Sequence, residues 1–261
     1  MLKLHYLLLL VGLLLIQACQ QKPESETQAA GSGKEYNRSD AASYNVQLGL
    51  AYLKQGDRPR AKRKLLLAIE QAPDSPSVNA AMAYFMEKTG ELEEAQSYYQ
   101  KAMALAPGSG AQLNNYGTFL CRQGQYQQAE KYFLQAVKDV KYENTAGAYE
   151  NAGLCAMVIP AHAKAIEYFG KALEQDPSRK QSLYELVRLE SQQNHNDQAL
   201  AYLEKYPMLS LRDRVLLTLA ADVAHKTGKI ELEASYRARL HQLNNFSDNT
   251  GVKHDNDSDN G

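Results

Sequence analysis

A spacing of 34 residues recurs through the middle of the chain. Gly56, Gly90 and Gly124 are each 34 residues apart. The same step separates two further triplets of small residues and one pair of prolines: Ala61, Ala95 and Ala129; Ala68, Ala102 and Ala136; Pro73 and Pro107. Small residues at fixed offsets and a single period indicate a row of equivalent structural units.

Each recurring position has a mechanical reason. A glycine can adopt the left-handed conformation that ends a helix, and a proline after a helix stops it. Small residues where two helices meet allow close packing, and the eighth position of a unit provides them. It holds Gly49, Ala83, Gly117, Gly153 and Ala221, whereas Val187 departs from the pattern.

The pattern resembles the tetratricopeptide repeat, a pair of antiparallel helices. We therefore predict an all-α fold, a right-handed superhelical solenoid whose first helices line a concave surface. Six units are expected, over residues 42–75, 76–109, 110–143, 146–179, 180–213 and 214–247, with 248–261 as a disordered tail. Units five and six follow the pattern least, as is typical of a capping end.

The N-terminus resembles a bacterial lipoprotein signal. Lys3 precedes an apolar run over residues 7–16, and "IQAC" ends at Cys19. The resemblance implies that residues 1–18 are removed, that Cys19 carries lipid and that 19–41 are a flexible tether. Gln20, in place of an aspartate, resembles cargo sorted to the periplasmic face of the outer membrane. The alternative is an ordinary secretory signal with an incidental cysteine.

Composition and motifs narrow the function. A net charge of −1 gives no reason to expect nucleic-acid binding. No phosphate-binding loop, paired-histidine metal motif or nucleophile elbow occurs, and the histidines are dispersed among different units. We therefore predict a protein-binding array without enzymatic activity, cofactor, metal or small-molecule substrate.

The repeat register predicts which residues face the partner groove. The candidates lie on the first helices of units one to three: Val46, Leu50, Leu53, Lys54, Tyr84, Lys88, Asn114, Thr118 and Arg122. Lys54, Lys88 and Arg122 occupy equivalent positions and form a row of cations. They could bind acidic groups of a partner, or they could simply offset the dipoles of helix C-termini. We expect Tyr98 and Tyr99 to be exposed on a second helix.

Two cysteines lie in the first helices of neighbouring units. Cys121 and Cys155 fall near the same level, and an exported protein meets an oxidising compartment. A disulfide would fix the angle between units three and four. The alternative is a pair of buried free thiols.

Three stretches are similar to the PilF/PilW family of type IV pilus biogenesis lipoproteins. They are "NVQLGLAYLKQGDRPRAKRKLLLAIEQAPDSPSVNAAMAYFMEKTGELEEAQSYYQKAMALAP" (45–107), "GAQLNNYGTFLCRQGQYQQAE" (110–130) and "AYENAGLCAMVIP" (148–160). The resemblance implies a pilotin, which binds the pilus secretin subunit and promotes its localisation and multimer assembly at the outer membrane. Its partners would be the secretin, the membrane through the lipid, and the lipoprotein sorting machinery. The alternative is a lipid-anchored adaptor that recruits cell-wall hydrolases or synthases.

Overall fold

The computed structural model describes residues 37–159 and 161–249, with side chains up to Asn244. The described helices from Ser39 onward belong to one compact unit. The predicted signal (1–18), Cys19, most of the tether and the end of the tail lie outside the described residues. None of the helices in the described ranges is both long and apolar enough to cross a membrane.

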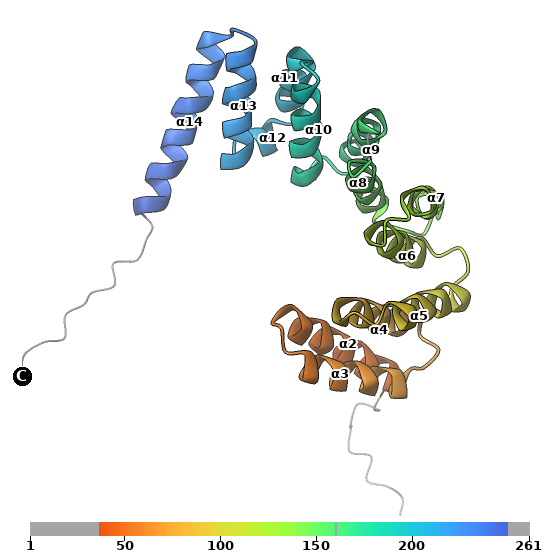
Figure 1. Cartoon of the computed structure of the whole chain (residues 1–261). Coiled ribbons are helices and arrows are strands. Elements are labelled where there is room, and N and C mark those ends of the chain that lie inside the picture. Colours follow the sequence, from red (N-terminus) through yellow and green to blue (C-terminus); the bar gives the residue numbers. More distant parts are fainter. Residues whose placement is uncertain (1–36, 160, 250–261) are drawn as a thin grey trace, which may run out of the picture. The chain divides into compact units, whose positions relative to one another are not determined.

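Helices follow one another in antiparallel pairs along the described chain (Figure 1). The pairs are α2 (Arg38–Lys54) with α3 (Arg58–Gln71), α4 (Pro76–Thr89) with α5 (Leu92–Leu105), α6 (Gly110–Arg122) with α7 (Tyr126–Ala136), α8 (Thr145–Ala156) with α9 (His162–Gln175), α10 (Lys180–Gln192) with α11 (Asn196–Lys205), and α13 (Arg214–Lys226) with α14 (Ile230–Asn249). Each first helix from α4 onward also contacts the first helix of the next pair. The predicted all-α repeat fold is confirmed.

The small residues lie at close contacts between paired helices, as the pattern predicted. A Cβ on Gly49 would lie 2.7 Å from the Leu65 side chain, and one on Gly153 would lie 2.7 Å from the Phe169 ring. The alanines at the twentieth position are fully buried between the paired helices: Ala61, Ala95, Ala129, Ala165 and Ala199. The turns use left-handed residues, and Asn194 replaces glycine at one of them with φ 64°. Close packing therefore dictates the repeat.

Polar contacts link successive second helices as well. Glu130 on α7 accepts hydrogen bonds from Lys164 Nζ at 2.8 Å and from Tyr168 Oη at 2.6 Å, both on α9. Partial burial acts to raise the pKa of Glu130, but these two hydrogen bonds outweigh it, and the pKa lies below the usual value. The carboxylate therefore stabilises the junction between units three and four in its charged form.

Two boundaries differ from the predicted ones, and one short helix was not predicted. Helix α2 begins at Arg38 within the predicted tether, with Asp40 in its first turn, where a negative charge is favourable. Helix α14 runs to Asn249, beyond the predicted start of the tail. A one-turn helix, α12 (Pro207–Ser210), follows α11, since proline suits the first turn of a helix but not its interior.

Candidate partner-binding groove

A groove of about 550 Å³ runs over the first helices α2, α4, α6 and α8. Its lining changes in character from one unit to the next. Apolar residues of the first two units line one part: Val46, Leu50, Ala80, Ala81 and Tyr84. Polar residues of units three and four line the other: Gln112, Asn114, Asn115, Thr118 and Asn151. The groove can therefore accept a segment with an apolar part followed by a part that forms hydrogen bonds.

The apolar part is continuous with the core. Val46 and Leu50 are half-buried and pack against the core cluster of the first two units. Tyr84 is more exposed than these two residues, with 37 % of its surface accessible. An apolar side chain of a partner would thus cover the tyrosine ring and the upper edges of the aliphatic residues, which favours binding through loss of water contact.

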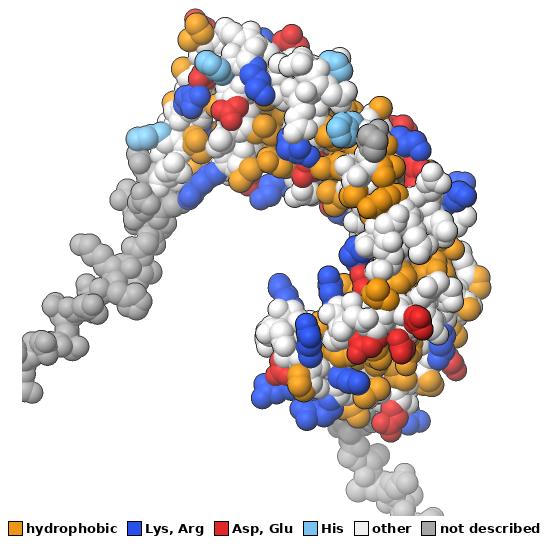
Figure 2. Space-filling model, viewed as in Figure 1, with side chains coloured by type: hydrophobic (Ala, Val, Ile, Leu, Met, Phe, Trp, Pro, Cys, Tyr) orange, Lys and Arg blue, Asp and Glu red, His pale blue; other side chains and the backbone are white. Residues whose placement is uncertain are grey.

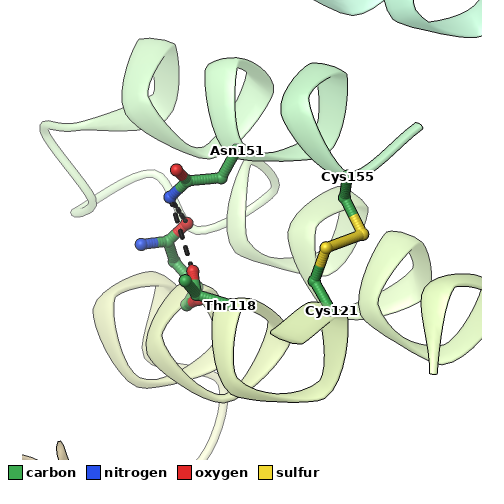
Figure 3. The surroundings of a disulfide bond; sticks show 5 residues. Thr118, Cys121, Asn151 and Cys155 are labelled. Atoms are coloured by element: carbon green, nitrogen blue, oxygen red, sulfur yellow. Dashed lines mark hydrogen bonds between the residues drawn. A yellow bond between two sulfur atoms is a disulfide. The ribbon is translucent and has the colours of Figure 1, made fainter. Parts of the chain in front are cut away.

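The polar part is a cluster of amide and hydroxyl groups (Figure 3). Asn151 Nδ2 on α8 donates to Asn114 Oδ1 on α6 at 3.0 Å and lies 3.5 Å from Thr118 Oγ1. Thr118 Oγ1 in turn donates to the Asn114 carbonyl at 2.8 Å. Side-chain amides both donate and accept, so the cluster matches the alternating N–H and C=O groups of an extended peptide backbone.

Gln112 adds an acceptor at this end. The residue is only 8 % exposed, and no donor reaches its Oε1 among the residues that the structure describes. A buried acceptor of this kind is stabilised when a donor arrives. Because this oxygen is itself covered, a backbone N–H of a bound segment would reach it only if the side chain turned toward the groove.

A second hollow of about 460 Å³ adjoins the groove and shares Leu50 and Tyr84 with it. Its walls include Leu53, Lys54 and Lys88. Lys88 Nζ lies 5.3 Å from the centre of the Tyr84 ring. Within the described chain, no carboxylate lies at ion-pair distance from Lys54 or Lys88. These two cations are therefore available to an acidic group.

Arg122, the third member of the predicted row, is different. Its guanidinium forms a two-pronged ion pair with Glu87 of the preceding unit, and the Glu87 side chain is only 5 % exposed. Tyr99 Oη donates to the same carboxylate at 3.1 Å. Arg122 thus lines the groove as a neutralised charge, and the row of three equivalent cations is reduced to two.

Tyr99 also corrects a prediction. It is 3 % exposed rather than on the surface, and its ring lies 5.1 Å from that of Phe119 between centroids. Burial raises the pKa of Tyr99, and the charge of Glu87 raises it further. The phenol therefore remains a hydrogen-bond donor at any physiological pH.

Cys121 and Cys155 form a disulfide between α6 and α8, with their Cα atoms 5.9 Å apart (Figure 3). Cys155 is buried, at 3 % exposure. The cysteines lie about one helical turn beyond Thr118 and Asn151 on the same two helices. The covalent link therefore fixes the helix spacing on which the amide cluster depends.

The predicted groove residues fall in the two hollows together, but the register missed two positions. The third position of unit three contributes Gln112. Sixth positions also reach the groove, in the form of Ala81, Asn115 and Asn151. The asparagines at the sixth position of two successive units were the sequence signal that could have identified the sixth position as part of the groove. No group of three or more metal-ligating side chains occurs within the described ranges.

Sequence models of the tetratricopeptide repeat match residues 46–110 and 120–180, and a second such model matches 161–223. The fold and these matches define a tetratricopeptide repeat protein. The chain is also 30% identical over 206 residues to the type IV pilus assembly protein PilF of Pseudomonas aeruginosa, which covers 79% of this chain and 82% of that protein. The chain therefore belongs to the PilF family.

Two solved structures are similar to this chain in fold. A structure of Pseudomonas aeruginosa PilF superimposes with a TM-score of 0.64 at 28% identity, over 82% of this chain and all of that one. PilW, described as a widely conserved type IV pilus biogenesis factor, gives a TM-score of 0.61 at 24% identity, over 77% of this chain and 92% of that one. The PilW likeness is a likeness of fold.

Proposed function

We propose that this chain is an outer-membrane lipoprotein of type IV pilus biogenesis that binds the secretin subunit and promotes its localisation and multimer assembly. Membership of the PilF family supports the link to the pilus. The observation that carries the binding role is the groove over the first helices, which is apolar at one end and amide-lined at the other.

The chemistry of the groove suits such a client. A secretin subunit exposes strand edges and apolar surface before its barrel closes, and an exposed edge tends to aggregate. An extended edge offers backbone N–H and C=O groups to Asn114 and Asn151, and apolar side chains to the Tyr84 end. A lipid on Cys19 would carry the bound subunit along the lipoprotein route.

The test is deletion of the gene, followed by immunoblotting of separated inner and outer membranes for the secretin without heating. We expect multimers to disappear and subunits to accumulate in the inner membrane. Wild type should restore them, and so should Gln96→Ala, a control at an exposed position of α5 outside the groove. Cys19→Ala should fail through loss of the anchor, and Tyr84→Ala combined with Asn151→Ala should fail through loss of recognition.

Normal secretin multimers in the deletion strain would overturn the proposal. Crosslinking to the groove would then decide for the alternative, an adaptor for cell-wall hydrolases or synthases. If the groove variant restored the multimers as wild type does, while Cys19→Ala did not, the pilotin role would stand. Recognition would then occur at another surface.

A further inference from the structure

Helix α3 stands apart from the other second helices in its charge. It contains five Lys or Arg residues and one Glu, although the whole chain has a net charge of −1. None of the second helices α5, α7, α9, α11 and α14 contains more basic than acidic residues. Figure 2 shows Lys and Arg side chains gathered over the first helix pair.

The outer side of α3 combines charge with apolar surface. We call Lys62, Arg63, Leu66 and Leu67 the outer basic face; together with Pro59 and Glu70 they border a shallow hollow of about 500 Å³. Leu66 is 48 % exposed and Leu67 is 37 % exposed. Neither Lys62 nor Arg63 lies at ion-pair distance from a carboxylate in the part of the chain that is described.

The repeat does not require these residues. The core side of α3 is supplied by Ala61, Leu65 and Ala68, all fully buried. One period later, the positions of the outer basic face hold Gln96, Ser97, Gln100 and Lys101, all exposed. Two exposed leucines beside two cations are therefore a property of the first unit and not of the fold.

We propose that the outer basic face docks on an anionic phospholipid surface. Helices that lie on membranes combine Lys or Arg with leucines that enter the headgroup boundary, and the cations attract anionic lipids. A second copy of the chain is a poor occupant, because a two-fold contact would bring Lys62 and Arg63 against their own copies.

The position of α3 fits this occupant, and here the proposal rests on the lipid anchor of the proposed function. Asn45 Nδ2, midway along α2, donates to Gln71 Oε1 at the end of α3 at 2.9 Å. The N-terminal half of α2 thus lies beside the C-terminal half of α3, which contains the leucines. From Cys19 to Arg38 the chain can span at most about 65 Å, which bounds how far the face can lie from an anchored lipid.

Docking would leave the partner groove accessible. The groove is lined by α2, α4, α6, α8 and Tyr99 of α5, and α3 contributes only Arg58 to the adjoining hollow. The outer basic face shares no residue with either. The first helix pair would then bind lipid on one side and the partner on the other.

The chain contains no tryptophan, so the fluorescence of a single introduced tryptophan comes from one known position. Lipidated chain carrying Leu66→Trp is reconstituted with vesicles of brominated phosphatidylcholine, with or without phosphatidylglycerol. Bromine quenches tryptophan emission on contact. The matched reference is Val140→Trp, at a position that is 98 % exposed between α7 and α8.

We expect strong quenching at position 66 only with phosphatidylglycerol, and weak quenching at position 140 in both vesicles. The difference should vanish when salt rises from about 0.1 M to about 1 M, where the screening length falls from about 10 Å to about 3 Å. Lys62→Gln with Arg63→Ser, the residues of unit two, should lower the ratio of docked to undocked chains roughly 30-fold.

Equal quenching at positions 66 and 140 in the presence of phosphatidylglycerol would overturn the proposal and leave an acidic protein segment as the occupant. Flotation with phosphatidylcholine vesicles alone reports the lipid anchor. A chain that fails to float overturns the anchor, whereas a chain that floats with equal quenching overturns only the docking of α3.

Discussion

Reduction of the Cys121–Cys155 disulfide should be the most destabilising single chemical change that leaves every side chain in place. The bond joins residues 34 apart in sequence. A loop of that length, released in the unfolded chain, regains conformational entropy equivalent to about 3.8 kcal/mol at 25 °C. Because reduction leaves both sulfur atoms in place, it removes only the covalent link and opens no cavity.

The assay is urea unfolding followed by circular dichroism, with and without reductant. The midpoint should fall by at least roughly 1 M urea when the bond is reduced. Repeat arrays can unfold in parts, so amide hydrogen exchange should accompany it, and α6 and α8 should lose more protection than α13 and α14. Cys121→Ala with Cys155→Ala is the control, since its midpoint should not respond to reductant.

Two results would refute this reasoning. A count of two free thiols in denatured, unreduced protein would show that the cysteines are not joined. An unchanged midpoint after complete reduction would show that the loop entropy is already lost in the unfolded chain, or that the array loses structure elsewhere first.

Three further predictions concern single side chains, each measured by urea unfolding. Glu87→Gln should cost about 1–2 kcal/mol, less than for a fully buried pair because Arg122 is 37 % exposed; no loss would show that the pair contributes nothing. Gly153→Ala should cost about 1–3 kcal/mol through overpacking, whereas Gly170→Ala, with no foreign atom closer than 3.9 Å, should be neutral or stabilising. Glu130→Gln should cost about 1 kcal/mol at pH 7. Because the folded-state pKa of Glu130 is lowered, that contribution is present above the ordinary glutamate pKa and is lost on acidification, so the wild-type advantage should disappear toward pH 3.

The fold could be predicted from sequence because close packing leaves no freedom at a few positions. A glycine against Leu65 or Phe169 and an alanine buried between paired helices recur at a fixed period. Those requirements come from the close approach of paired helices, and most units repeat them, although Val187 departs from the pattern. The extra helix α12 escaped prediction because it follows from one proline in the most divergent part of the array.

The site could be predicted only in outline. Register shows which side of a helix a residue occupies, and it placed Tyr84 and Asn114 on the groove side. It cannot show which charges neutralise one another between units. Arg122 reaches back 35 residues to Glu87, and that carboxylate also holds Tyr99 inside. Such pairing depends on side-chain conformations that a repeat pattern does not specify.

The disulfide connects stability with recognition. Asn114 and Asn151 meet across the same two helices that the bond joins, and their 3.0 Å hydrogen bond requires a fixed helix spacing. A groove with preset spacing loses less freedom when a partner binds. Reduction should therefore weaken partner binding at urea concentrations where the helices persist. If binding were unchanged while stability fell, the spacing would instead come from the packed core, in which Phe133 of α7 and Phe169 of α9 are buried, and the bond would serve stability alone.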